Sequence, residues 1–255
     1  MSYLGNTKIG KMYLGNTEIA KAYLGNTLVF QNGGSPTPPP PPVGDTPFIR
    51  NTSLGAYIDT GITADDTVKI IVWARNFNPG GGFLFGSRDN TTQNTFGIGA
   101  HSAANTGRIR LDYSQANNTF ADNQFKNLSH YRKYEFYNGV LRIDDEIVAT
   151  ATGVSFSNQH NIHLFGVNSA GTHADMSLPV DVCACKIYKN DVLVRDFSAV
   201  GTPSVGLYDA VSETVFTNAG SGTFTYGTFD SSAYSALEYI ECSGAQYFLT
   251  PESGT

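Results

Sequence analysis

Charged side chains are scarce in this chain, at 15% of its 255 residues, where globular domains typically carry about 25%. The charges that are present sum to a formal net charge of −6. Binding to nucleic acid depends on Lys and Arg side chains that neutralise phosphates. We therefore expect no nucleic-acid partner.

Cysteine is also rare, with three residues in the chain. An odd number without a regular spacing argues against a disulfide framework and favours synthesis in a reducing cytoplasm. Cys183 and Cys185 are two residues apart in a strand-like run, while Cys242 is far away. We expect the first two to share one face of a strand as small buried side chains.

Long apolar runs are missing as well. No segment approaches the roughly 20 apolar residues of a membrane span, and the N-terminus lacks the basic and apolar regions of a signal peptide. We expect no membrane partner and export by a route other than secretion. Polarity comes from Asn, Thr and Ser, beside 27 Gly, 14 Tyr and 16 Phe. This composition is typical of β-rich extracellular or virion proteins.

The N-terminal segment contains one pentapeptide three times, ten residues apart. Gly-Asn between β-favouring residues predicts a tight turn. The strands between these turns form either an antiparallel meander or a solenoid-like arc that keeps Ile9, Ile19 and Val29 on one face. In the meander, Tyr13 faces Glu18, and Met12 faces Ile19. The three copies of Tyr-Leu-Gly-Asn-Thr are Tyr3–Thr7, Tyr13–Thr17 and Tyr23–Thr27.

Both faces of this repeat would be half apolar, and about thirty residues cannot bury two such faces alone. The segment therefore needs a cover, which is either copies of itself or a surface on which it docks. Packing of an ordinary hairpin on the following domain is the alternative. The residues expected to mediate anchoring or oligomerisation are Ile9, Met12, Tyr13, Leu14, Ile19, Tyr23 and Val29.

A proline-rich linker follows the repeat over residues 32–44, with an unbroken run at Pro38–Pro42. Such a run forms polyproline II and acts as a stiff spacer, which argues against packing of the repeat on the next domain. An SH3-ligand function lacks the flanking basic residues. The predicted organisation is a repeat at 1–31, the linker, a sandwich at 45–232, and the start of a possible second module at 233–255.

The long central region shows strand patterns only. Val68–Arg75 alternates Val68, Ile70, Val72 and Ala74 with Lys69, Ile71, Trp73 and Arg75, while Asn138-Gly139 predicts a hairpin turn. Another hairpin is expected around Lys189–Asp191. Short strands with regular turns predict an all-β fold, either a β-sandwich or a jelly roll.

Three segments resemble the laminin G-like, concanavalin A-like sandwiches of phage virion proteins: Phe48–Ile62, Glu135–Glu146 and Gly206–Gly227. The repeat resembles N-terminal segments of phage structural proteins. The resemblance implies a jelly-roll β-sandwich preceded by a short β-repeat anchor, in a head or tail fibre or decoration protein. It further implies location in the virion, a homo-oligomer such as a trimer, contacts with other virion proteins, and attachment to host-surface glycans.

The segment Leu237–Thr250 echoes Pro47–Thr60, with an aromatic-Ile pair near the start and Gly-Ala before a Tyr. It therefore has the pattern of the opening strand of a second sandwich module. Either the natural chain continues past Thr255 or this strand pairs elsewhere.

We expect no catalytic, cofactor or metal site. The acidic groups Asp65-Asp66 and Asp144–Glu146 fall at predicted turns, and the Glu-x-Asp-x-Glu strand motif of glycosidases with this type of fold is missing. His160 and His163 are a single pair that we expect in a loop. For calcium, the conceivable carboxylates form no dense ligand loop; they are Asp89, Asp175 and Asp181.

A glycan site would combine an aromatic face with fixed polar groups. Trp73, Arg75, Arg108 and Arg110 are the candidates, from outward-facing strand positions. Packing of Trp73 between the sheets is the alternative. The rival functions are a bacterial surface adhesin and, against the missing carboxylate motif, a carbohydrate-active enzyme.

Overall fold

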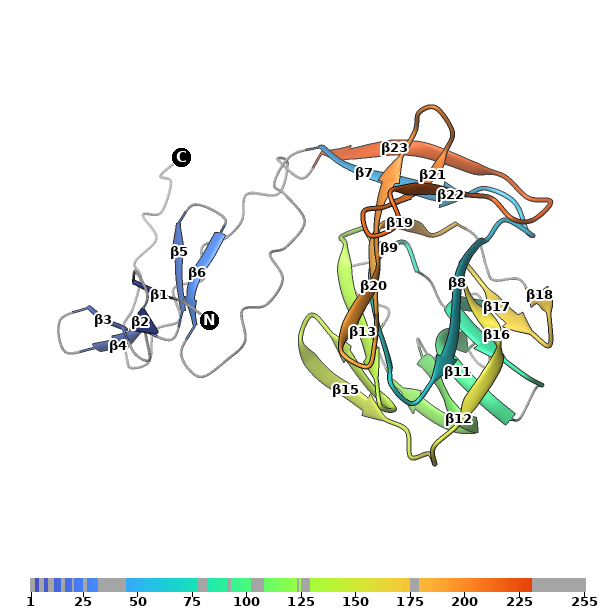
Figure 1. Ribbon diagram of the computed structural model, residues 1–255, viewed down its shortest axis with the longest axis horizontal. Helices are drawn as coiled ribbons and strands as arrows, with labels where there is room; N and C mark the ends of the chain where they lie inside the picture. The colour runs from blue at the N-terminus through green and yellow to red at the C-terminus, as the bar shows by residue number, and fades with distance from the viewer. Residues whose placement is uncertain are drawn as a thin grey trace, which may run out of the picture. The chain divides into compact units, whose positions relative to one another are not determined.

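Every regular element that the computed structural model describes is a β-strand (Figure 1). In this part of the chain, no helix is long and apolar enough to cross a membrane. Two compact units are present, Thr46–Phe229 and the remainder. The residues described are 3–4, 7–8, 12–14, 17–19, 21–24, 27–31, 45–77, 82–90, 93–101, 108–122, 124, 129–174 and 179–230.

The N-terminal repeat forms three antiparallel hairpins, one around each Gly-Asn. The predicted register is confirmed, since Met12 is opposite Ile19 and Tyr13 is opposite Glu18. In the third hairpin the register shifts, so that Val29 has no partner between Leu28 and Phe30. The strands are β1 (Tyr3–Leu4), β2 (Thr7–Lys8), β3 (Met12–Leu14), β4 (Thr17–Ile19), β5 (Lys21–Leu24) and β6 (Thr27–Gln31).

The predicted meander is not observed, because each described repeat strand pairs only within its own hairpin. Each Gly-Asn turn brings together the two strands that flank it. The outer edge of each strand has no partner strand among the described residues. Ile9, the linker at 32–44 and the module predicted at 233–255 lie outside the described residues.

The larger unit is a β-sandwich, and the all-β fold is confirmed. Within the described residues it consists of a ten-stranded and a seven-stranded sheet. The first contains β7 (Asp45–Asn51), β9 (Val68–Arg75), β13 (Arg132–Tyr137), β14 (Val140–Ile143), β15 (Glu146–Thr150), β19 (Asp181–Lys189), β20 (Val192–Val200), β21 (Gly206–Asp209), β22 (Thr214–Thr217) and β23 (Phe224–Asp230). The second contains β8 (Ile58–Asp65), β10 (Gly82–Arg88), β11 (Gln93–His101), β12 (Arg108–Ala121), β16 (Ser157–Leu164), β17 (Val167–Ser169) and β18 (Thr172–Ala174).

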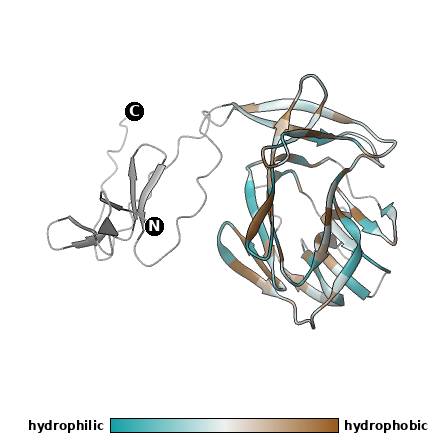
Figure 2. Ribbon diagram, in the orientation of Figure 1, coloured by the Kyte–Doolittle hydropathy of each residue, from teal (hydrophilic) through white to brown (hydrophobic). Residues whose placement is uncertain are grey.

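The core lies between the inner faces of the two sheets, and Figure 2 shows hydrophobic stretches along strands of the sandwich. On β9 the predicted alternation is confirmed: Val68, Ile70, Val72 and Ala74 belong to this core. On β12, Ile109, Leu111 and Tyr113 do the same. The residues between them therefore point to the outer faces of the two sheets, where several of them, such as Trp73 and Asp112, are also covered.

The prediction that Cys183 and Cys185 share a face is wrong. Val182 pairs with Ala74 and Ala184 pairs with Trp73, so Cys183 is an extra residue in β19. This bulge reverses the alternation. Cys183 consequently packs in a small outer cluster and Cys185 in the main core.

The tight turns predicted from Asn-Gly and Asn-Asp pairs are confirmed. Asn138 and Gly139 have φ angles of 48° and 72°, and Asn190 and Asp191 have 51° and 60°. Two successive positive φ angles define the type I′ turn, whose twist matches that of the flanking strands. The turn between β14 and β15 has the same form.

The segments that enter and leave the sandwich bond to each other. Thr52 N donates to Thr223 O, and Gly222 N donates to Gly55 O. The strands β7 and β23 pair side by side (Figure 1). Because Thr52 follows β7 and Thr223 precedes β23, the strands run antiparallel, and the start of β7 lies beside the end of β23.

Candidate functional site

The first two glycan candidates lie on the outer face of the ten-stranded sheet. Trp73 is only 6% exposed and packs with Phe48, Ile71 and Cys183, on the opposite side of the sheet from the main core. The alternative of packing between the sheets is therefore wrong for Trp73. Its indole is also covered, so it offers little aromatic surface to a sugar.

Arg75 is held by a buried carboxylate. Asp181 is fully buried and accepts hydrogen bonds from Arg75 Nε at 2.7 Å and from Asn76 Nδ2 at 3.0 Å. Arg50 donates to the same carboxylate through Nε and Nη2, at 2.5 and 2.8 Å. The Arg75 guanidinium also stacks over Phe229, with 4.0 Å to the ring centroid. Cationic and amide donors therefore occupy the carboxylate that was considered for calcium.

The other two candidates lie on β12, in the seven-stranded sheet. Arg108 Nε forms an ion pair with Asp122 at 2.6 Å, in which both side chains are exposed. Arg110 Nε forms one with Asp112, also at 2.6 Å. The four candidates thus occupy the outer faces of two different sheets and do not form one site.

Arg110 belongs to a group of side chains that the sequence reasoning missed. On the outer face of β10, β11 and β12, Arg88 and Arg110 lie over the same Phe83 ring, at 5.7 and 5.8 Å from its centroid. Arg88 Nε donates to Ser169 Oγ at 3.0 Å. We name this group the arginine face and define it as Phe83, Arg88, Thr95, Arg110 and Asp112.

Two polar atoms of the arginine face are buried without a hydrogen-bond partner among the described residues. They are Asp112 Oδ2 and Thr95 Oγ1. Burial raises the pKa of Asp112, while Arg110 and Arg88 act in the opposite direction. Buried polar atoms are rarely left unsatisfied, so this face has an unmet capacity for hydrogen bonding.

A sequence signal for this face exists in Phe96–Ala100. Gly97 and Gly99 alternate with apolar residues that point into the core. Gly97 lies opposite Asp112 and Gly99 lies opposite Arg110. One face of β11 therefore carries no side chains at these positions, which lets the long side chains of β10 and β12 approach each other across it.

A second polar group lies around His163 on β16. The Tyr57 ring stacks on His163 and His173, with 4.2 Å between centroids in each case. Burial lowers the pKa of His163 to about 4, against the pull of Asp59. His160 and His163 both lie in β16, so the prediction of a loop is wrong. No group of three potential metal ligands is found in the part of the chain that the structure describes.

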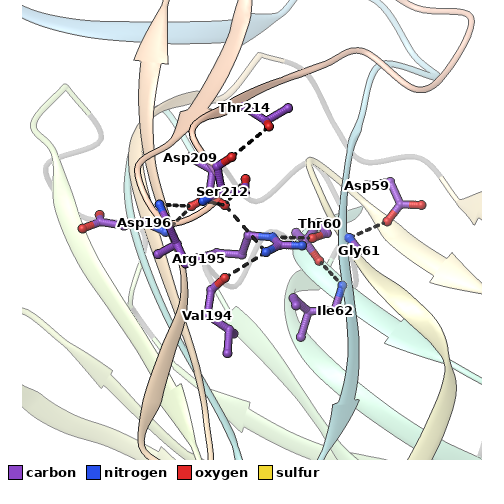
Figure 3. A network of polar contacts seen from close by, with 11 residues as sticks. Asp59, Thr60, Gly61, Ile62, Val194, Arg195, Asp196, Asp209, Ser212 and Thr214 are labelled. Atoms are coloured by element: carbon purple, nitrogen blue, oxygen red, sulfur yellow. Dashed lines mark hydrogen bonds and ion pairs between the residues drawn. The ribbon is translucent and has the colours of Figure 1, made fainter.

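A third polar group connects the sheets at Asp209 (Figure 3). The carboxylate accepts hydrogen bonds from Asp196 N at 2.7 Å and Ser212 Oγ at 2.7 Å, and lies 3.6 Å from Arg195 Nη1. Arg195 Nε donates to Thr60 O on β8 at 2.9 Å. These contacts join β20 and β21 to the opposite sheet, so they explain the group as a structural link.

The acidic groups at turns have structural partners. Asp144 accepts from Arg132 Nε at 2.8 Å and Lys133 N at 2.9 Å, and Asp145 pairs with Lys133 Nζ. Asp65 accepts from Thr67 N at 2.9 Å. The predicted position at a turn is confirmed for Asp144 and Asp145, whereas Asp65 is the last residue of β8 and accepts a hydrogen bond from the turn that follows it.

The fold and these contacts define an all-β sandwich protein whose distinctive surface is the arginine face. No protein-family model matches the chain, and no curated protein matches it. Function is therefore inferred from the residues and their geometry.

Proposed function

We propose that this protein is a structural fibre or decoration protein of a phage virion. The N-terminal repeat anchors and oligomerises the protein, and the proline-rich linker projects the sandwich. The sandwich is of the laminin G-like, concanavalin A-like jelly-roll type and attaches the particle to host-surface glycans. It performs no catalysis in this role.

The observation that carries the proposal is the threefold repetition of one hairpin. The first two hairpins pair in the same register, with Leu4 opposite Thr7 and Leu14 opposite Thr17. An isolated two-stranded hairpin is marginally stable in water. Three such units in series gain stability when a repeating partner surface covers them, as in a cyclic oligomer or a particle lattice.

The sandwich supports a binding role more than an enzymatic one. Its carboxylates at Asp65, Asp144 and Asp181 accept hydrogen bonds that hold turns or buried arginines. A retaining glycosidase needs two carboxyl groups about 5 Å apart that are available to the substrate. The contacts of these three residues serve the fold instead.

The test is incorporation of the protein into particles, measured together with its oligomeric state by analytical ultracentrifugation. Ile19→Asp places a charge opposite Met12 without changing a turn residue. We expect this variant to lose the oligomer or to be missing from purified particles. Glu18→Gln, at the adjacent position on the other face of the strand, is the matched control and should assemble normally. Normal assembly and incorporation of Ile19→Asp would contradict the proposal.

A further inference from the structure

We infer that the arginine face binds an acidic saccharide through a carboxylate and a neighbouring hydroxyl group. The inference rests on the proposed attachment function, since it names the kind of glycan that the sandwich would bind. The contacts that support it lie in the sandwich and do not depend on the N-terminal repeat. It starts from the two buried atoms that lack a partner, Asp112 Oδ2 and Thr95 Oγ1.

The register places these atoms on one side of the seven-stranded sheet. Asp112 lies opposite Gly97, and Thr95 is two residues from that glycine on the same strand. Phe96 and Ile98 point into the core, so Thr95 and Gly97 point outward. Asp112 is 1% exposed and Thr95 is fully buried. The Asp112 and Thr95 side chains therefore contact a ligand only if it inserts between the longer side chains around them.

Those neighbours are Arg88 and Arg110, whose guanidinium groups each use Nε in a hydrogen bond to a described residue. Arg110 uses Nε for Asp112, and Arg88 uses Nε for Ser169. In the described part of the chain, their Nη atoms have no hydrogen-bond partner. Guanidinium groups recognise carboxylates through paired N–H donors. Both guanidinium groups lie over the Phe83 ring within cation–π distance, so their positive charges are close to each other on one surface.

The complementary ligand follows from this set of groups. Two guanidinium edges require an acceptor with negative charge, while Asp112 Oδ2 requires a donor. The Thr95 hydroxyl accepts or donates. A sugar acid satisfies all of them at once, because its carboxylate can pair with the arginines while an adjacent hydroxyl donates to Asp112. A plain carboxylate leaves Asp112 without a donor, and a neutral sugar leaves the arginines without an anion.

The alternative occupant is ordered water. A buried water typically makes about three hydrogen bonds to polar groups that lack other partners. Water would satisfy Asp112 and Thr95 equally well, but it would give the arginine face no preference among solutes.

In the experiment, the full-length protein is titrated with sodium glucuronate, glucose or sodium acetate. Binding is measured by isothermal titration calorimetry and from the chemical shifts of the backbone amides. Glucuronate should bind saturably and at least about tenfold more tightly than glucose or acetate, the ratio expected from one additional charged hydrogen bond. The largest shifts should fall in β10, β11 and β12.

Three variants test the assignment. Asp112→Asn and Arg110→Gln should each weaken glucuronate binding about tenfold or more, since each removes one charged partner. Arg108→Gln changes the same strand at an arginine that pairs with the exposed Asp122, so it should bind within about twofold of the parent. Melting temperatures check that each variant is folded, and Arg110→Lys replaces Arg110→Gln if that variant does not fold.

Absence of saturable binding, equal affinity for the three solutes, or an equal loss in Arg108→Gln would overturn the inference and leave water as the occupant. Asp112→Asn should still incorporate into particles. Failure of ligand binding with normal incorporation therefore rejects this site alone, whereas normal assembly of Ile19→Asp rejects the proposed function.

Discussion

Asp181 shows how one residue neutralises buried positive charge. It accepts hydrogen bonds from Arg50, Arg75 and Asn76 while fully buried, and Arg75 is itself only 12% exposed in its side chain. A buried cation that loses its partner keeps its desolvation cost.

We predict that Asp181→Ala lowers the free energy of unfolding by about 3–5 kcal/mol, the usual cost of breaking a buried ion pair. Asp122→Ala removes the exposed partner of Arg108 and should cost less than about 1 kcal/mol. Urea denaturation of both variants measures the difference. Equal effects would show that burial of Asp181 adds nothing to the strength of its ion pairs.

His163 provides a prediction about pH. Burial lowers its pKa to about 4 from the usual 6.5, so the folded protein holds the neutral imidazole more firmly than the unfolded chain does. The stability that depends on neutral His163 is therefore present above pH 6.5 and is lost as the pH falls toward 4. NMR titration of the imidazole should show His163 neutral at pH 5.5, where exposed histidines are mostly charged. A midpoint near pH 6.5 would refute the burial argument.

At the scale of elements, the hydrogen bonds between the entry and exit segments explain several glycines. A Cβ at Gly222 would lie 2.3 Å from Ala56 N and 2.7 Å from Leu54 O. The backbones of the two segments are in direct contact, so these positions exclude larger residues.

We predict that Gly222→Ala destabilises the sandwich by about 1–3 kcal/mol, as overpacking usually does. Ser221→Ala, at the adjacent exposed residue, should change stability by less than about 0.5 kcal/mol. Thermal unfolding of the two variants gives the comparison. If both behave like the parent, the segments separate without cost and do not fasten the sandwich.

Sequence reasoning succeeded where the signal was local. Alternation correctly predicted the inner face of β9, and Asn138-Gly139 correctly predicted the turn between β13 and β14, because a period of two and positive φ angles are properties of neighbouring residues. It failed at Cys183, since a bulge in β19 depends on the partner strand. It also grouped Trp73 and Arg75 with Arg110 although they lie on different sheets, because only the pairing of β10, β11 and β12 places Arg88 beside Arg110 and Asp112.

At the scale of the whole molecule, one continuous core joins both sheets of the sandwich. Its members come from β7, near the start of the unit, through β21, near its end. A core of this extent normally supports independent and cooperative folding.

We predict that the fragment 45–232 folds without the repeat and the linker. It should be β-rich by circular dichroism and should unfold in one cooperative transition that tryptophan fluorescence from Trp73 and far-ultraviolet circular dichroism report at the same temperature. The full-length protein serves as the control, with its transition for the sandwich at the same temperature. A molten or aggregated fragment would show that residues outside these boundaries complete the fold.

The adjacent ends of β7 and β23 have a mechanical consequence. A pulling force applied across the sandwich through its two ends would open this strand pair from the shared end, one hydrogen bond after another. Such a peeling load meets less resistance than a load that shears a whole ladder at once. The tension would pass first through the two terminal strands, of which β7 also pairs with β19 and contributes Ile49 to the main core. The sandwich would therefore yield first at the β7–β23 pair, while β7 remains held by its pairing with β19 and by Ile49 in the main core.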